Sequence, residues 1–495
     1  MIQFAPAPPS VRKIDPRLLH RITTLIIVAA CSLWSISASF AAEKDATRCR
    51  PNIILILADD LGFGDLGCYG HPRFKTPRID RLAAEGVRLT QCNTPCPYCA
   101  PTRAALLTGR YPSRCDMLHN PAPDAGPKAD LIALPRSEAT LAEVLRASGY
   151  ATGMVGKWHL GHKPGTLPTD RGFDEYFGIL YSNDMRPVQV RDGTEVVEDP
   201  AQQATLTERY TRRAVDFIER KKTEPFFLYL AHAMPHKPLA ASEKFYRKSG
   251  AGLYGDAMAE LDASVGAVVD ALQAAGLDDD TLVIFTSDNG PWFGGSTGGL
   301  RGMKASTYEG GSRVPCIARR PGVIPAGKES SQLTATMDLF ATIVAATGAK
   351  IPLDASGRAR TIDGVNLLPL FTGSAQPSRE FVFGCHGGKI ATVRDARWKL
   401  HMLPPTEPKM KLEADGRWLD PRGPDATKIL APPEQYSPDA RPGTTTGAAP
   451  AALQLFDLTA DPSEQHDVAT QHPEEVERLR QALEAFTLET LGKRS

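Results

Sequence analysis

A cysteine begins one of the best-marked helical segments of the chain. Residues 99–110 read Cys-Ala-Pro-Thr-Arg-Ala-Ala-Leu-Leu-Thr-Gly-Arg, and Pro101 and Gly109 suit the first turn and the end of a helix. A thiol there lies near free backbone N–H groups, and Arg103 adds positive charge. We therefore expect a lowered pKa for Cys99 and an anion bound beside it. Taken alone, Cys99 is better interpreted as a buried structural thiol or half of a disulfide, and the rest of the chain reverses this interpretation.

Polar side chains follow four predicted strands, each at the point where the strand ends. The strands are apolar runs at 52–57, 150–155, 226–230 and 281–286, and they alternate with helical patterns. This alternation predicts an α/β fold, with a mostly parallel central sheet and helices on both faces. Because ligands bind outside the carboxyl ends of parallel strands, these polar residues should converge at one edge. They are Asp59, Asp60, Lys157, His159, His232, His236, Asp288 and Asn289.

Oxygen ligands dominate this predicted edge. Carboxylate and amide oxygens suit Ca²⁺ or Mg²⁺ better than Zn²⁺, and two pairs at like strand ends favour a metal site over a helix cap or a turn. The pairs are Asp59 with Asp60 and Asp288 with Asn289. Cys92, Cys96 and Cys99 are followed by no Cys or His pair at zinc spacing, so a zinc site is not predicted.

A dinucleotide-binding pattern, Gly-x-Gly-x-x-Gly, also follows the first strand, at 62–67. Two carboxylates stand where a pyrophosphate would approach, and Pro72 and Pro77 interrupt the place of the required helix. We therefore interpret the glycines as allowing a tight turn beside the acidic pair, not as a nucleotide site.

Cationic and imidazole side chains could bind an anion and move protons. Lys157, Lys304 and Arg103 could clamp a tetrahedral anion, and His159 and His236 could transfer protons. Each of these side chains alone is compatible with a solvated or hydrogen-bonded bystander. Together with a metal and a nucleophile, they predict hydrolysis of an anionic ester.

The segment at Cys99 resembles the sulfatase signature, Cys-x-Pro-x-Arg-x-x-x-x-Thr-Gly-Arg, in which the cysteine is oxidised after translation to formylglycine. The similarity also includes residues 59–60, 156–159, 181–184, 235–236, 287–290, 301–304, 455–458, 461–462 and 464. It implies an alkaline-phosphatase-like α/β domain. Met303 departs from the glycine common at its position, and a disulfide between Cys96 and Cys99 would block the oxidation.

The resemblance implies a role for each matching position. Ca²⁺ would be held by Asp59, Asp60, Asp288 and Asn289, together with an oxygen of the modified Cys99 or of the bound sulfate. One hydroxyl group of the hydrated aldehyde would attack sulfur and expel the alcohol, and His159 is a candidate base for the later release of sulfate. Arg103 would hold the hydrate.

The remaining implied roles concern the sulfate group. Lys157, Lys304 and Ser182 would hold sulfate oxygens, and His236, with Lys304, would stabilise or protonate the leaving oxygen. His232 matches the family pattern less well and would only shape its loop.

The implied activity is sulfuric ester hydrolysis of the arylsulfatase type, acting on a sulfated small molecule or carbohydrate. It requires a formylglycine-generating or equivalent maturase as a partner. Two alternatives stay open at this stage. One is a phosphodiesterase or phosphonate monoester hydrolase on the same scaffold, and the other is an inactive sulfoglycan-binding protein.

The N-terminus predicts export. Basic residues at 17–21 precede an apolar run at 22–36, and Ser39-Phe40-Ala41 offers small residues to a signal peptidase, so residues 1–41 are interpreted as a signal peptide. The run is too short for a comfortable membrane span, so no transmembrane anchor is expected in the mature chain. A secreted or periplasmic protein is expected, with a lipoprotein acylated at Cys31 as the alternative.

The charge balance and a change in the secondary-structure pattern describe the rest of the 495-residue chain. Its 57 basic and 57 acidic residues balance, which gives no support for a nucleic-acid partner. Near residue 375 the strand–helix alternation gives way to short antiparallel patterns at 381–384, 390–394 and 398–402, followed by a helix at 473–491. We predict a catalytic domain at 48–375 and a smaller C-terminal α+β domain at 376–495.

Overall fold

The computed structural model describes residues 50–374, 379–407, 411–419 and 428–492. The predicted signal peptide at 1–41, including Cys31, lies outside these residues. Among the residues that are described, no helix is long and apolar enough to cross a membrane.

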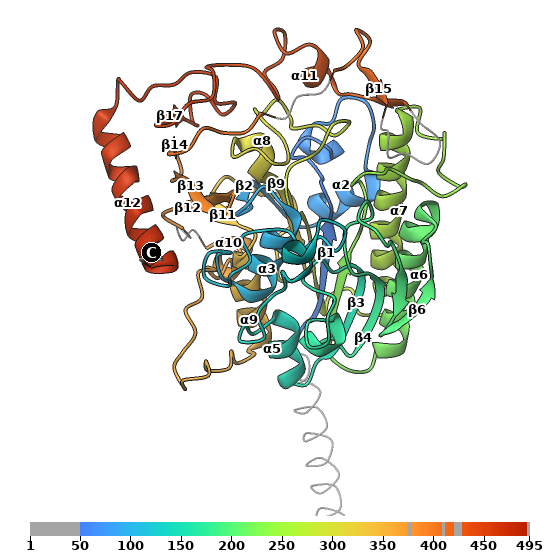
Figure 1. Ribbon diagram of the computed structural model, residues 1–495. Coiled ribbons are helices and arrows are strands. Elements are labelled where there is room, and N and C mark those ends of the chain that lie inside the picture. Colours follow the sequence, from blue (N-terminus) through green and yellow to red (C-terminus); the bar gives the residue numbers. More distant parts are fainter. Residues whose placement is uncertain (1–49, 375–378, 408–410, 420–427, 493–495) are drawn as a thin grey trace, which may run out of the picture. The chain divides into compact units, whose positions relative to one another are not determined.

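A large sheet forms the centre of the part that begins at Pro51 (Figure 1). Its strands are β1 (Asn52–Ala58), β2 (Val87–Asn93), β3 (Ala151–Lys157), β4 (Glu175–Ile179), β5 (Val190–Asp192), β6 (Glu195–Glu198), β7 (Phe226–Ala231), β8 (Thr281–Ser287), β9 (Arg313–Arg319), β10 (Lys328–Ser330) and β11 (Thr334–Ala335). The order is β10-β2-β9-β8-β1-β7-β3-β4-β5-β6, and β11 pairs with β2. Neighbouring strands from β8 to β4 are all parallel. The predicted mostly parallel sheet is confirmed.

Strand β1 shows why the central strands have unbroken apolar sequences. Ile54 and Ile56 belong to one buried core, whereas Ile53, Leu55 and Leu57 belong to the core on the opposite face. Successive side chains of a strand point to opposite faces, so a strand covered on both faces needs an unbroken apolar run.

Helices cover both faces, as expected (Figure 1). One core contains α2 (Pro77–Ala84), α6 (Leu206–Lys221) and α7 (Gly252–Ala274), and the other contains α3 (Cys99–Thr108), α5 (Leu141–Ala147) and α9 (Asp338–Thr347). The shorter helices are α4 (Pro127–Asp130), α8 (Glu309–Ser312), α10 (Leu368–Phe371), α11 (Pro433–Tyr436) and the 3₁₀ turns Gly67–Tyr69, Pro168–Arg171 and Gln203–Thr205.

A separate antiparallel sheet lies in the C-terminal part. It comprises β12 (Val382–His386), β13 (Lys389–Arg394), β14 (Trp398–His401) and β17 (Gln454–Asp457), and α12 (Pro473–Leu491) packs on it. Glu309 of α8 joins it to the large sheet. Glu309 accepts hydrogen bonds from Arg394 Nη1 at 2.6 Å and Lys399 Nζ at 3.0 Å, and from Asn93 Nδ2 of β2 at 3.3 Å. The domain boundary near residue 375 stays a prediction.

Three features of the fold were not predicted. At one end of the large sheet, β4, β5 and β6 pair antiparallel. Strands β2 and β9 pair antiparallel beside the parallel strands. A two-stranded hairpin, β15 (Arg417–Leu419) with β16 (Lys428–Leu430), lies within the proline-rich stretch that has little periodicity in sequence.

Candidate active site

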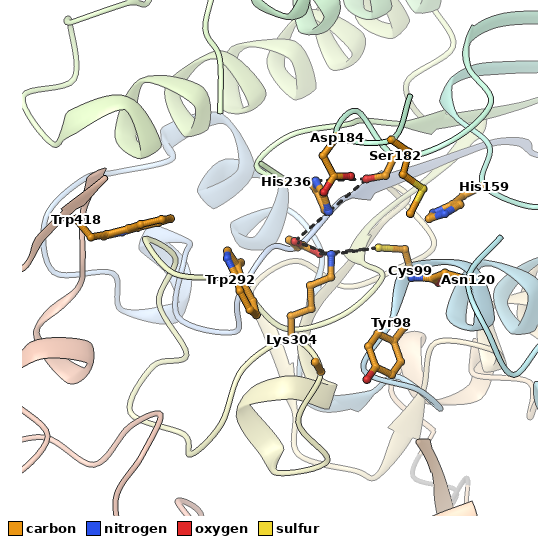
Figure 2. A pocket seen from close by; sticks show the side chains of 13 residues that line it. Tyr98, Cys99, Asn120, His159, Ser182, Asp184, His236, Trp292, Lys304 and Trp418 are labelled. Atoms are coloured by element: carbon orange, nitrogen blue, oxygen red, sulfur yellow. Dashed lines mark hydrogen bonds and ion pairs between the residues drawn. The ribbon is translucent and has the colours of Figure 1, made fainter. Parts of the chain in front are cut away.

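A pocket of about 420 Å³ brings together residues that follow several strands of the large sheet (Figure 2). This volume is typical of a small-molecule site. The pocket is lined by Asp60, Tyr98, Cys99, Asn120, His159, Ser182, Asp184, Met185, His236, Trp292, Lys304, Ala305 and Trp418. The convergence predicted from the strand ends is therefore observed for Asp60, His159 and His236.

Cys99 is the first residue of α3, as predicted, but its thiol is not acidic. Burial and the neighbouring Asp59 carboxylate raise the pKa of Cys99 well above its usual value. The Sγ atom lies 3.4 Å from Asp59 Oδ1 and 3.5 Å from Lys304 Nζ. The expected lowering was wrong because desolvation and a nearby carboxylate outweigh the helix terminus. All described cysteines are free thiols.

Arg103 lies one turn further along α3 and contacts the acidic group instead of the thiol. Its Nε donates to Asp288 Oδ2 at 2.9 Å, and its Nη1 donates to the Lys157 carbonyl at 2.7 Å. The guanidinium group is fully buried. It therefore joins the ends of α3, β3 and β8.

Three buried carboxylates, Asp59, Asp60 and Asp288, form the acidic end of the site. Burial opposes ionisation of Asp59, but Lys157 and the other cations nearby hold its pKa well below the usual range. Burial and the Asp59 carboxylate raise the pKa of Asp288 to about 7. Asp60 has a positive φ of 62°, a strained conformation for a residue other than glycine.

Asn289 completes this oxygen-rich group. Its Nδ2 donates to Asp60 Oδ1 at 2.7 Å, whereas its own buried Oδ1 has no hydrogen-bond partner. A buried, unpaired amide oxygen beside carboxylates is the donor set that a hard cation takes. Ligand atoms of Asp59, Asp60, Cys99 and His236 lie within 4.8 Å of one another. The residues present therefore fit a Ca²⁺ ion.

Two lysines face these carboxylates. Lys157 Nζ bonds to an Asp59 carboxylate oxygen and lies 3.1 Å from Ser182 Oγ. Lys304 Nζ lies 2.8 Å from Asp60 Oδ1. Burial favours the neutral amines, yet Asp59 and Asp60 raise the pKa of Lys157 and of Lys304, respectively. Both lysines therefore remain cationic.

His159 is held as a neutral ring. Burial and the Lys157 charge lower the pKa of His159 well below its usual value. Its Nε2 lies 3.1 Å from the Pro121 carbonyl oxygen, so Nε2 carries the hydrogen. The buried Nδ1 has no hydrogen-bond partner. A φ of 63° strains the residue, a feature that clusters at functional sites.

His236 is oriented by its neighbours. Its Nδ1 donates toward Asn183 Oδ1 at 2.9 Å and the Lys237 carbonyl at 2.6 Å. Its Nε2 lies 3.2 Å from Ser182 Oγ and 3.6 Å from Asp60 Oδ2. Asn183 is thus a positioning residue that the sequence analysis did not single out, although it lies in a quoted segment.

His232 does not line the pocket. It is buried beside Ser264 Oγ, 3.2 Å from its Nε2, and near the Tyr210 ring. The expectation that it only shapes its surroundings agrees with this position.

Glycines near the site allow close approach of the backbone. The Asp65 N–H donates to the Gly62 carbonyl oxygen at 3.1 Å, so the expected tight turn beside the acidic pair is present. A Cβ on Gly62 would lie 2.0 Å from the Ser296 carbonyl oxygen, so this glycine also allows close packing. A Cβ on Gly156 would lie 1.8 Å from the Ala231 carbonyl oxygen, and its φ is +114°. Gly156 therefore sets the end of β3 just before Lys157.

Several lining residues were missed from the sequence. They are Tyr98, Asn120, Asp184, Met185, Trp292 and Trp418. Tyr98 and Trp292 stand next to motifs that were recognised, so proximity in sequence could have indicated them. Asn120 Oδ1 accepts the Ala100 N–H at 3.0 Å and satisfies a free amide of the first turn of α3. Nothing in the local pattern indicates Trp418.

Comparison with known proteins shows the family of the chain. The sulfatase family model matches residues 51–349. The chain is 41% identical to N-acetylgalactosamine-6-sulfatase of Canis lupus familiaris over 405 residues, which cover 76% of each chain. The chain belongs to the sulfatase family. It is a sulfuric ester hydrolase, and the predicted family resemblance is confirmed.

Two further matches support the sulfatase assignment. Human arylsulfatase A is 40% identical over 390 residues, covering 71% of this chain and 75% of that protein. A solved structure described under the metabolism of multiple glycosaminoglycans by Bacteroides thetaiotaomicron matches with a TM-score of 0.72 and 29% identity. It covers 88% of this sulfatase and 99% of its own chain.

Proposed function

We propose that this sulfatase removes sulfate from carbohydrate esters, with Cys99 acting in its oxidised formylglycine form and Ca²⁺ as the bound metal. The relatives named for N-acetylgalactosamine 6-sulfate support a sulfated amino sugar as substrate. The observation that carries the proposal is the position of Cys99, whose Sγ lies 3.4 Å from Asp59 Oδ1 and 3.5 Å from Lys304 Nζ. A reacting group there touches both the acidic and the cationic side of the site.

The four oxygen-bearing residues would hold Ca²⁺. They are Asp59, Asp60, Asp288 and Asn289. The unpaired Asn289 Oδ1 supports this assignment, because burial without a partner is costly. Bound Ca²⁺ supplies positive charge that attracts a sulfate group and polarises its oxygens.

Formylglycine at Cys99 supplies, as its hydrate, the hydroxyl group that attacks sulfur. The surrounding side chains bind and orient the ester for this attack. Lys157 Nζ and Ser182 Oγ are 3.1 Å apart and can both donate to sulfate oxygens. Arg103 holds the ends of three elements in place through Asp288 and the Lys157 carbonyl.

His159 is suited to accept the proton that must leave the reacting residue. Its Nδ1 is unprotonated, unpaired and buried, and the Pro121 carbonyl fixes the hydrogen on Nε2. The lowered pKa keeps the ring neutral before it acts. These features support His159 as the general base.

The leaving oxygen is served by Lys304 and His236. Lys304 stays protonated beside Asp60 and can donate a hydrogen bond. Burial and Lys304 lower the pKa of His236 to about 4, so its ring is neutral in the free protein at pH 7. We assign Lys304 as the donor to the leaving oxygen and His236 as a second group beside it.

We also propose export through the predicted signal peptide at 1–41 and activation by a formylglycine-generating or equivalent maturase. An exported enzyme meets sulfated polysaccharide outside the cell, which agrees with a carbohydrate substrate.

Esters of one phenol test the reaction class. The values of kcat/KM for 4-nitrophenyl sulfate, 4-nitrophenyl phosphate and bis(4-nitrophenyl) phosphate are compared, together with sulfate release from N-acetylgalactosamine 6-sulfate. We expect the sulfate ester to be preferred over both phosphates and the sugar to be desulfated. A preference for either phosphate would favour the phosphatase alternative, and binding without turnover would favour the sulfoglycan-binding one.

A further inference from the structure

Two tryptophans far apart in sequence line the active-site pocket. Trp292 comes three residues after Asn289, and Trp418 comes from the β15–β16 hairpin. In Figure 2 both lie beyond Lys304 and His236 as seen from Cys99 and His159. The pocket therefore has a charged end, where sulfate chemistry is proposed, and an aromatic end.

The aromatic end is a packed structure. Lys237 Nζ lies 3.4 Å from the centre of the Trp418 ring and 5.8 Å from that of Trp292. The Phe293 ring meets both indoles edge to face, with centroids 5.2 Å from Trp292 and 6.0 Å from Trp418. Cation–π and edge-to-face contacts of this kind fix ring orientation. Lys237 also follows His236 directly, so the aromatic cluster adjoins the proposed leaving-group residue.

Helix α11, which follows the hairpin that carries Trp418, is hydrogen-bonded to the loop that carries Trp292. Gln435 Oε1 accepts the Gly294 N–H at 3.1 Å, and its Nε2 donates to the Gly295 carbonyl at 2.9 Å. Ser296 Oγ donates to Glu434 Oε1 at 2.5 Å. Ile429 of β16 is buried in the core of the large sheet. The two tryptophans therefore keep a fixed relation to the site.

The two indole rings differ in solvent exposure. Trp418 is 4% exposed, with Lys237 over its ring, whereas Trp292 is only partly buried. A partly exposed indole on a pocket wall offers a flat apolar surface. The Phe293 ring contacts both indoles and lies near Lys237 Nζ, so Trp418 and Lys237 support that wall through Phe293.

We propose that Trp292, supported by Trp418, is the platform on which the sugar ring of the leaving group stacks, and that this pair selects carbohydrate sulfates over small alkyl sulfates. The proposal rests on the proposed function and names the part of the substrate that this end of the pocket recognises. One face of a pyranose ring carries C–H groups that pack on an indole, while its hydroxyl groups remain hydrated. The sulfate group, held at the charged end, would place the ring against Trp292.

Binding without turnover tests this platform. Calorimetry on Cys99→Ala protein with Ca²⁺ present measures Kd for N-acetylgalactosamine 6-sulfate and for methyl sulfate, an ester that has no ring. The same Kd values are measured after adding Trp292→Ala, Trp292→Phe or Trp418→Ala. Trp398→Phe is the matched control, because Trp398 lies in β14 and does not line the pocket.

Trp292→Ala should weaken binding of the sugar sulfate by about tenfold or more and leave methyl sulfate unchanged. Trp418→Ala should have the same selective effect, and Trp292→Phe should retain most of the affinity. Unchanged methyl sulfate binding also shows that each variant is folded.

The outcomes separate this proposal from the function on which it rests. If methyl sulfate binds and the sugar sulfate is insensitive to both tryptophans, the platform is overturned and the sulfate site stands. If the sugar binds through Trp292 but methyl sulfate does not bind, the platform stands and the proposed sulfate site is contradicted. If neither ligand binds the parent protein, both proposals fall.

Discussion

Asn289 donates from Nδ2 to Asp60 Oδ1 at 2.7 Å, although the two residues are 229 positions apart. This hydrogen bond orients the amide so that Asn289 Oδ1 is left buried and unpaired. Because an unpaired buried oxygen is costly, the contact indicates a bound partner for that atom. In the proposed account the partner is Ca²⁺.

Asn289→Ala should therefore weaken Ca²⁺ binding by about tenfold or more, since it removes one hard oxygen ligand. Calorimetric titration of metal-free protein with Ca²⁺ measures this change. Asn366→Ala, at an exposed asparagine, should leave the affinity unchanged. Equal Ca²⁺ affinity in the two variants would contradict the assignment of Asn289 as a ligand.

His159→Ala should lower kcat by about a hundredfold or more, because a general base typically contributes that much. KM should change little, since the groups that hold the sulfate remain. Steady-state kinetics with an aryl sulfate measures both values. His162→Ala is the control, because this nearby histidine pairs with Asp130 and does not line the active-site pocket. A kcat for His159→Ala within about twofold of the parent would exclude it as the base.

His232 predicts a specific acid sensitivity of the fold. Burial lowers the pKa of His232 to about 3, from the ordinary histidine value of about 6.5. As the pH falls below 6.5 the unfolded chain binds a proton there and the folded chain does not. The contribution of neutral His232 to the free energy of unfolding is therefore fully present above pH 6.5. It is lost as the pH falls toward 3, by up to about 1.4 kcal/mol per pH unit.

His232→Gln should remove this dependence. Denaturant unfolding between pH 7 and pH 4 is expected to show a smaller loss of unfolding free energy in the variant than in the parent. His466→Gln, at a histidine whose side chain is 83% exposed, should behave like the parent. Parallel curves for the parent and His232→Gln would show that His232 is not the acid-sensitive group.

The fold was largely predictable because its main signals are local. The unbroken apolar run of β1 reports burial on both faces, and Gly109 ends α3 in the left-handed conformation expected of a helix terminus. Helix α5 begins at Leu141, because Thr140 and Glu143 form a capping box, another local signal. Antiparallel β2 and β9 were missed, since pairing direction is not written in a strand's own sequence.

The candidate site was also predicted only in part from the sequence. Residues at strand ends, such as Asp60 and His236, were found because topology brings those ends together. The pKa of Cys99 was predicted in the wrong direction, because it depends on burial and on Asp59, 40 positions away. Trp418 was out of reach, since tertiary contacts bring it to the pocket, among them that of the following helix α11 with the loop after Trp292.

The mass of the peptide that contains Cys99, measured on the same preparation that is assayed for sulfate release, tests the central claim most directly. Active protein should carry an aldehyde in place of the CH₂SH group, and sulfate release should rise with the fraction of converted peptide. Cys99→Ala should release no sulfate. Full activity from protein whose Cys99 peptide retains the unmodified thiol would contradict the account.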